Sequence, residues 1–159
     1  MNAIYPTRRA VAAVALGMPV ALLLALATPG LWFVGTAWSV AVLILLAVDT
    51  GLGMRNLRLT VDADLPETLG VGRSVLARFV ISFPSAAPPS LEVELEGNGR
   101  LSIAPRRQML PVEGPVASAR FQLDPLRRGE GLLENVWLRW TGPLGLAHIQ
   151  HKHRMGRKL

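Results

Sequence analysis

Three histidines close to the C-terminus are the side chains best suited to hold a metal ion. His148, His151 and His153 lie within the last 12 residues of the chain. His151 and His153 would share one face of a strand, so a zinc or nickel site is stereochemically possible. Such a site would need further ligands, however, and the sequence neighbours of the histidines are lysines and arginines. We therefore expect no metal site, and we interpret residues 151–159 as a basic tail or the start of a linker.

Three glutamates at alternate positions form a second candidate for chemistry. Glu92, Glu94 and Glu96 would lie on one face of a strand, about 6.6 Å apart. Neighbouring carboxylates can serve acid–base catalysis or bind a divalent cation. The residues between them are leucine and valine, a pattern typical of a solvated strand face opposite an apolar core face. We therefore interpret the glutamates as surface residues.

The familiar signatures of enzymes are missing from the sequence. It contains no G-x-S-x-G, H-E-x-x-H or P-loop pattern, and the glycine-containing segments 50–53 and 70–74 do not complete a phosphate-binding motif. The chain has no cysteine, which removes thiolate nucleophiles, disulfides and cysteine-ligated metal centres. We predict no catalytic residue and no cofactor, and we expect that the chain is not an enzyme.

The charge balance favours a basic partner-binding surface or a membrane location. Lysine and arginine total 17 against 11 acidic residues, giving a net charge of +6. Anionic lipid headgroups, nucleic acid and an acidic protein surface are three partners that such a chain could bind. Trp137 and Trp140 do not interleave with the basic residues after them, so the aromatic pattern of nucleic-acid binders is absent. The lipid bilayer is the expected partner.

The helices and strands that would position these residues can be predicted from the uneven distribution of charged residues along the chain. The chain has 159 residues, of which 50% are hydrophobic, and Ala10–Val48 contains no charged side chain. One helix of that length would measure about 58 Å, nearly twice a hydrocarbon core of about 30 Å. Thr28-Pro29-Gly30 is a strong turn signal within it. We therefore predict a tail over 1–9, transmembrane helices over 10–27 and 31–48, and a turn over 28–30.

Arginines predict the orientation of this hairpin. Arg8 and Arg9 precede the first span, Arg55 and Arg58 follow the second, and the turn between the spans has none. The positive-inside rule then places both ends in the cytoplasm. Alternatively, residues 1–27 are a signal peptide ending in a small-residue cleavage site. Even then the second span would stop transfer and leave the following domain in the cytoplasm.

Beyond the hairpin, the hydrophobic period changes from helical to alternating. Apolar residues repeat at every second position in several short segments, separated by Gly-, Pro- and Asn-rich turns. The expected strands lie in 57–63, 75–83, 91–95, 117–123 and 132–140, with weaker candidates over 101–104 and 144–149. This punctuation predicts an all-β, Ig-like antiparallel β-sandwich over 56–150.

The order of motifs resembles a known family. The hairpin is followed by Leu57–Ala63, by Leu69-Gly70-Val71-Gly72 before a long strand, by Arg127-Arg128-Gly129, and by Gly142-Pro143-Leu144-Gly145-Leu146. This order is similar to the N-terminal half of the bacterial "domain of unknown function 58" family. There, an arginine-arginine-glycine turn leads into a strand that ends in D-P-L-G-L/F. In this chain Gly142 stands where that family usually has aspartate.

The resemblance implies a location and a partner. Family members continue into a von Willebrand factor type A-like domain, and they are often encoded beside MoxR-type AAA+ ATPases. This implies a role in an assembly complex at the bacterial inner (cytoplasmic) membrane. The chain stops at Leu159, where the linker to the second domain is expected, so we expect a fragment or a protein that lacks that domain.

These observations lead to one main hypothesis. The chain is expected to be a multi-pass, membrane-anchored, non-enzymatic β-sandwich scaffold facing the cytoplasm, associated with a MoxR-type AAA+ ATPase. Residues 127–129 and 142–146 are interpreted as a structural turn and loop or as a docking surface. The alternatives are an exported, envelope-facing ligand-binding domain and a metal-dependent enzyme that uses the three histidines.

Overall fold

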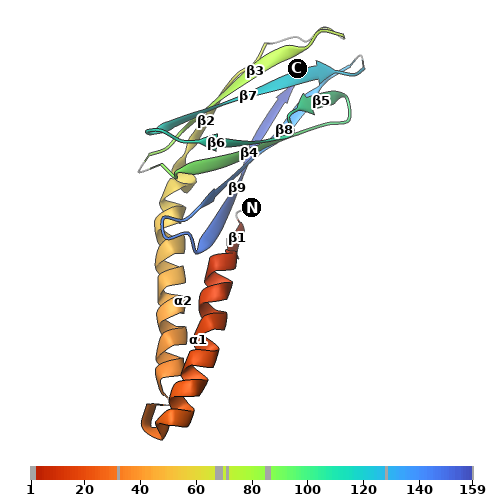
Figure 1. The fold of residues 1–159 in the computed structure, drawn as a ribbon. Coiled ribbons are helices and arrows are strands. Elements are labelled where there is room, and N and C mark those ends of the chain that lie inside the picture. The colour runs from red at the N-terminus through yellow and green to blue at the C-terminus, as the bar shows by residue number, and fades with distance from the viewer. Residues whose placement is uncertain are drawn as a thin grey trace. The chain divides into compact units, whose positions relative to one another are not determined.

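The computed structural model of the chain describes residues 3–31, 33–66, 70, 72–84, 87–127 and 129–158 (Figure 1). It divides into two compact units. We call Ile4–Arg55 together with Thr141–Ile149 the helical unit, and Met1–Ala3, Asn56–Trp140 and Gln150–Leu159 the β unit.

Two long helices dominate the helical unit. α1 spans Arg8–Ala27 and α2 spans Phe33–Met54, with a short 3-10 turn, η1, over Pro29–Leu31. Both helices are long and apolar enough to cross a membrane. They run antiparallel and side by side in Figure 1, so the start of α1 and the end of α2 lie at the same end of the pair.

Small residues let the two helices approach closely. A Cβ atom at Gly17 would overlap the indole ring of Trp38, and one at Gly35 would lie 2.8 Å from the Cβ of Ala21. The indole N–H of Trp38 donates a hydrogen bond to the carbonyl oxygen of Ala13 at 3.0 Å. Because glycine has no side chain, the two helices can approach closely enough for van der Waals contact at these positions.

Both helices extend beyond the predicted spans. α1 begins two residues earlier than predicted, because Thr7 is its N-cap and accepts a hydrogen bond from the backbone N–H of Ala10. α2 continues past Val48, the last residue of the uncharged block, and includes Asp49. The predicted span ended at the first charged residue, whereas the backbone hydrogen bonds of the helix continue beyond it.

The strands form two sheets. The five-stranded sheet has the order β1-β9-β8-β4-β6, and the four-stranded sheet has the order β2-β3-β7-β5. The pairs with an assigned register are antiparallel. The strands are β1 (Ala3–Pro6), β2 (Thr60–Asp64), β3 (Val75–Ser82), β4 (Ser90–Gly97), β5 (Leu101–Ala104), β6 (Arg107–Pro111), β7 (Val116–Pro125), β8 (Leu132–Thr141) and β9 (Ala147–Lys158).

Alternate side chains on both sheets are buried, as the hydrophobic period predicted. Phe79 on β3 and Phe121 on β7 are fully buried and meet edge to face, with ring centroids 5.7 Å apart. In the other sheet, Leu91 and Val93 on β4 and Leu138 on β8 are fully buried. The expectation of apolar helices followed by antiparallel sheets is therefore confirmed.

Several segments differ from the prediction. The expected tail over 1–9 contains strand β1, and strand β6 was not predicted. The segment expected as a strand over 57–63 is a 3-10 turn, η2 (Arg55–Arg58), followed by β2. Residues 151–158 continue strand β9 and are not a tail that leaves the domain. The sequence did not predict this part of the strand because its polar residues lack an apolar alternation. Within the β unit, Arg157 of this segment donates a hydrogen bond to the carbonyl oxygen of Ala63 at 3.4 Å.

Candidate functional site

A buried carboxylate near the end of α2 organises the most unusual site of the helical unit. The side chain of Asp49 is fully buried. Its Oδ1 accepts a hydrogen bond from the backbone N–H of Leu144 at 2.6 Å. Its Oδ2 accepts from the N–H of Leu146 at 2.7 Å and from that of Ala147 at 2.8 Å. One side chain of α2 thus binds three backbone donors of the segment that joins β8 to β9.

The segment Gly142–Leu146, which we call the β8–β9 loop, is shaped by two glycines. The N–H of Gly142 donates to the carbonyl oxygen of Ala147 at 2.8 Å, and the N–H of Gly145 donates to that of Gly142 at 2.9 Å. Gly145 has φ +73°, a left-handed conformation that favours glycine. A Cβ at Gly142 would lie 2.5 Å from Oδ1 of Asp49. Glycine at position 142 is therefore required by the carboxylate opposite it.

Thr7 binds the same loop from the start of α1. Its backbone N–H donates to the carbonyl oxygen of Leu146 at 2.8 Å. Its hydroxyl donates to the carbonyl oxygen of Gly145 at 2.8 Å while accepting from the N–H of Ala10. Thr7 is itself buried. The β8–β9 loop is consequently bound to the ends of both helices, through Thr7 on α1 and Asp49 on α2.

The next turn of α2 makes room for the start of β9. Gly53 follows Asp49 by four residues, so the two lie on one face of the helix. A Cβ at Gly53 would overlap the Cδ1 of Ile149, and Ile149 is fully buried. The absence of a side chain at position 53 therefore allows Ile149 to pack against the helix.

This arrangement positions a loop through one buried carboxylate. The hydrogen-bond donors to Asp49 are backbone N–H groups at 2.6–2.8 Å. Removing the acceptor would leave buried donors unsatisfied, at a cost of about 1–3 kcal/mol for each. The site therefore has the chemistry of a structural clasp between a helix pair and a strand connection.

The two motifs singled out in the sequence lie at opposite ends of β8. The β8–β9 loop, with Pro143 and Leu144 exposed, follows the strand. Arg127 and Gly129 precede it; Arg127 is exposed, and Gly129 has φ +120°. This positive φ is a backbone conformation that favours glycine in the turn. Arg128, Leu69 and Val71 lie outside the described residues.

The predicted glutamate face is an extended network of cross-strand pairs. Arg107 on β6 lies 3.1 Å from Glu92 through Nε and 3.0 Å from Glu94 through Nη2. Arg139 on β8 lies 3.2 Å from Glu92. The carboxylates of β4 are therefore paired with cations of both neighbouring strands, which is the arrangement of a charged sheet surface.

Glu96, the third glutamate, is held by neutral donors. Its Oε2 accepts from the indole N–H of Trp137 at 2.9 Å and from the amide of Asn135 at 2.8 Å. These hydrogen bonds favour the ionised form and lower the pKa of Glu96. The ammonium of Lys152 lies 4.8 Å from the ring centroid of the same Trp137 and adds to the effect.

The histidines are spread along β9. The ring centroids of His151 and His153 lie 6.4 Å apart, and Nδ1 of His148 lies 3.2 Å from the hydroxyl oxygen of Thr141. Burial disfavours the charged imidazolium and lowers the pKa of His151, with a further contribution from His153. Among the described residues, no group of three or more His, Cys, Asp or Glu side chains is placed to hold a metal ion.

The arginines that predicted the topology are exposed. Arg8 and Arg9 form the start of α1, and Arg55 follows the last residue of α2. Because the helices are antiparallel, these three side chains belong to the same end of the helical unit. Arg58, in the β unit, is exposed as well.

Asp49 was not identified as a site residue from the sequence. Its only local signal is that it is the first charge after the uncharged block and precedes Gly53 by one helical turn. The residues that bind it come 95 to 98 positions later. No protein-family model matches this chain, and no curated protein matches it significantly.

Proposed function

We propose that the chain is a membrane-anchored, non-enzymatic scaffold module. In this proposal α1 and α2 cross the bilayer as a hairpin, and the β unit is an Ig-like sandwich that faces the cytoplasm of a bacterium. The observation that carries the proposal is the exposure of an apolar helix pair whose charged residues are confined to one end.

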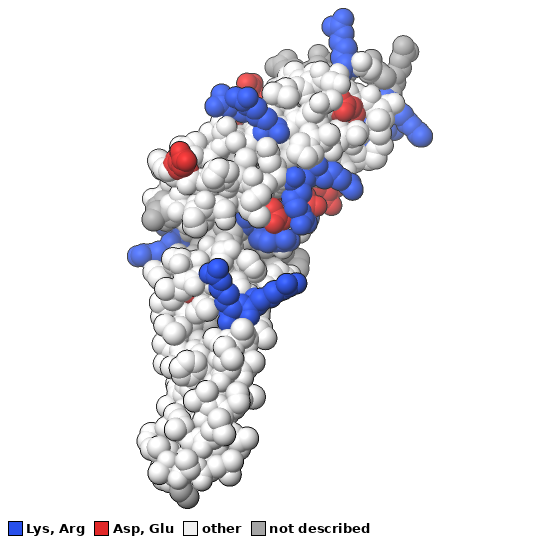
Figure 2. All heavy atoms as spheres, viewed as in Figure 1, with Lys and Arg blue, Asp and Glu red and all other residues white. Residues whose placement is uncertain are grey.

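The exposure of the helices supports a lipid environment. Only 6% of the residues in the apolar window of α1 and 11% of those in the window of α2 are buried. Leu16, Leu23 and Leu26 on α1 are 67–75% exposed. A core helix of a water-soluble protein would bury such residues, because apolar surface in water is unfavourable. Figure 2 shows the visible face of these helices without charged side chains over most of their length.

The charges at the end of the helices support the orientation. Arg8, Arg9 and Arg55 lie at the end where the chain enters and leaves the pair, and the turn over 28–30 has no charge. By the positive-inside rule this end is cytoplasmic. The clasp of Thr7 and Asp49 on the β8–β9 loop lies at the same end, where water can reach the polar groups before they pair.

The buried faces of the two sheets support a sandwich. Fully buried side chains occur on both sheets, and a Cβ at Gly97 on β4 would lie 3.2 Å from the Cδ1 of Ile103 on β5. Strands of different sheets therefore approach within side-chain contact in the β unit, as two packed sheets require.

The partner is inferred from the resemblance of the motifs over 127–129 and 142–146 to the domain of unknown function 58 family. We propose that the module belongs to an assembly system with a MoxR-type AAA+ ATPase. Arg127, which is exposed beside the glycine turn, is a side chain that such a partner can contact.

Reporter fusions test the location. A fluorescent protein and alkaline phosphatase are each fused after Leu159 of the whole chain. We expect fluorescence at the membrane and no phosphatase activity. The reverse result would reject the cytoplasmic orientation and favour the envelope-facing alternative. A variant with Arg8→Glu and Arg9→Glu controls for the charge rule, because its topology should become mixed.

Co-purification tests the partner. The full-length gene product is isolated from native membranes, and recovery of an AAA+ ATPase is the expected result. Recovery should fall with Arg127→Gln and stay unchanged with Arg120→Gln, a matched exposed arginine on β7. If no AAA+ ATPase is recovered with the unaltered protein, the assembly role is rejected.

A further inference from the structure

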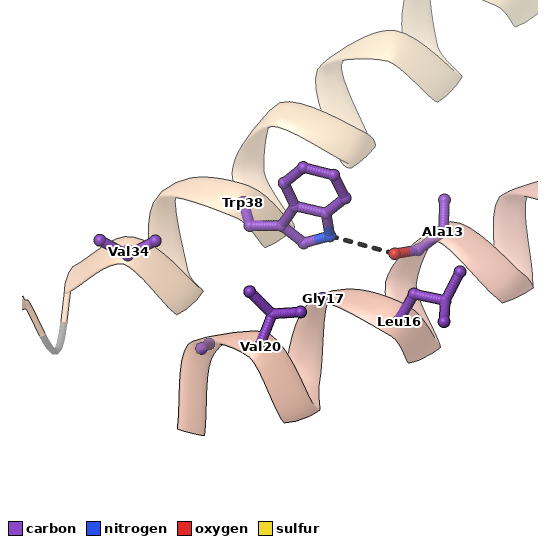
Figure 3. Close-up of a pocket in the computed structure, with 7 residues that line it drawn as sticks. Ala13, Leu16, Gly17, Val20, Val34 and Trp38 are labelled. Atoms are coloured by element: carbon purple, nitrogen blue, oxygen red, sulfur yellow. Dashed lines mark hydrogen bonds between the residues drawn. The ribbon is translucent and has the colours of Figure 1, made fainter. Parts of the chain in front are cut away.

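An apolar groove runs between α1 and α2. It encloses about 380 Å³ and is lined by Ala13, Leu16, Gly17, Val20, Ala21, Val34 and Trp38 (Figure 3). The only polar group among these side chains, the indole N–H of Trp38, already donates to the carbonyl oxygen of Ala13. The groove therefore offers shape and apolar contact to an occupant and no free hydrogen-bond donor from its side chains.

Two arginines precede the groove on the same helix. Arg9 precedes Ala13 by four residues and Gly17 by eight, so these residues lie along one face of α1. Arg8 likewise precedes Leu16, another lining residue, by eight positions. At a rise of about 1.5 Å per residue, the guanidinium-bearing turn begins roughly 6 Å from the first residue of the groove.

These arginines are not neutralised within the helical unit. Both are exposed, and no ion pair joins either of them to a carboxylate among the described residues. Asp49 is the only acidic residue in the sequence of this unit, and its oxygens bind the β8–β9 loop. The start of α1, which precedes the groove, is consequently cationic, with the guanidinium of Arg9 beside Gly145 of the β8–β9 loop.

We propose that this groove binds one anionic phospholipid, with its phosphate at Arg8 and Arg9 and an acyl chain along the wall formed by Trp38. A guanidinium pairs with two phosphate oxygens at once, and a cationic site at the membrane surface favours a lipid with net negative charge. An acyl chain matches the apolar lining. The inference rests on the proposed membrane location of the helices.

Trp38 lies in the wall of the groove and provides a local probe. The full chain is reconstituted in nanodiscs of phosphatidylcholine that contain a small fraction of brominated lipid, either phosphatidylglycerol or phosphatidylcholine. Bromine on the acyl chain quenches nearby indoles. The fluorescence quenching that disappears in the Trp38→Phe variant is the part that comes from Trp38, and it reports on the groove. We expect the brominated anionic lipid to occupy the site with a preference of roughly fivefold or more, as two arginines at a membrane surface predict.

Matched variants separate the two halves of the site. Arg8→Gln with Arg9→Gln should abolish the preference and retain quenching by bulk lipid, whereas Arg120→Gln on β7 should change nothing. Val20→Phe, which fills the groove, should reduce quenching by both lipids. Leu22→Phe, on another face of α1, should not. Free glycerol phosphate at the same concentration should not compete, because it lacks the acyl chain.

The outcomes distinguish this inference from the membrane proposal. If the protein does not incorporate into nanodiscs, the proposed membrane location fails. If it incorporates and both brominated lipids quench Trp38 equally, the helices are in the bilayer and the anionic-lipid site is rejected. If it incorporates and neither lipid quenches Trp38, the groove is covered by protein, such as a second copy, and the lipid site is also rejected.

Discussion

Gly142 lies so close to Asp49 that a Cβ atom at position 142 would come within 2.5 Å of the Oδ1 atom of the carboxylate. The glycine is therefore part of the same clasp as the acid. The backbone N–H groups of residues 144, 146 and 147 can donate three hydrogen bonds to this one side chain because the β8–β9 loop approaches it without an intervening Cβ.

The first prediction concerns this contact. Gly142→Ala should destabilise the protein by about 1–3 kcal/mol, because the added methyl group must displace a buried carboxylate or its loop. Thermal unfolding in detergent measures the change. Gly51→Ala on α2 is the control: a Cβ there meets nothing within 4 Å, so stability should stay equal or rise slightly. Equal effects of both substitutions would contradict the role of Gly142.

The second prediction concerns the carboxylate. Asp49→Asn keeps one acceptor oxygen but turns an amide N–H₂ toward backbone donors, so the free energy of unfolding should fall by about 1–3 kcal/mol. Hydrogen exchange of the amides of Leu144, Leu146 and Ala147 should accelerate. Unchanged protection of these three amides would show that the carboxylate does not hold the loop.

A third prediction transfers the acid to the loop. Gly142→Asp alone should be strongly destabilising, because two carboxylates would then share one buried site. Combined with Asp49→Ala, the new aspartate can accept from loop N–H groups two residues on, as in an Asx turn. The double variant should be more stable than the sum of the single effects by about 0.5–3 kcal/mol. Strict additivity would indicate that the two positions do not compete for one space.

The fourth prediction concerns the pairing of the helices. Gly17→Leu should separate α1 from α2, since even a Cβ at this position overlaps the indole of Trp38. The chain has no cysteine, so Ala21→Cys with Val34→Cys, two positions that line the groove from facing helices, introduces a single pair that a short thiol-reactive reagent should cross-link. Gly17→Leu should reduce the cross-link, and Gly30→Ala, which meets nothing within 4 Å, should not. A cross-link that survives Gly17→Leu would refute the close packing at Trp38.

The fifth prediction concerns pH. Hydrogen bonds from Trp137 and Asn135 lower the pKa of Glu96 in the folded protein. The unfolded chain therefore takes up the proton first as the pH falls, and the stabilisation, present at neutral pH, is lost below the unfolded pKa near 4.5. The side chain is near the surface, so the effect should stay below about 1 kcal/mol. Denaturant unfolding between neutral and acidic pH should show a smaller pH slope for Glu96→Gln than for the unaltered protein.

The coarse architecture could be predicted because two different periods succeed one another along the chain. An uncharged block interrupted by Thr28-Pro29-Gly30 predicts two helices, and alternation in segments such as 75–83 predicts strands. The helix ends were less accurate, since Thr7 caps α1 through a hydrogen bond and α2 continues beyond Asp49. The continuation of β9 through residues 151–158 was missed because the segment has polar residues at positions of both faces.

The clasp could be predicted only in part. The residues of Gly142–Leu146 were identified as a motif, and the structure gives that motif a steric and hydrogen-bonding role. Asp49 and Thr7 were not connected with it, because a pairing between a helix and a loop 95 residues later leaves no local pattern in the sequence. Such a partnership becomes visible only when the chain is folded.

The sequence distance between Asp49 and its donors also has a consequence for biosynthesis. When α2 leaves the ribosome, the loop that will bind its carboxylate has not been translated, because Leu144 follows 95 residues later. If the hairpin inserts as proposed, the acid lacks these three donors until then, which disfavours deep insertion of the last turns of α2. The hairpin is thus expected to dock first in a shallow position, and arrival of the β8–β9 loop would complete its seating after translation.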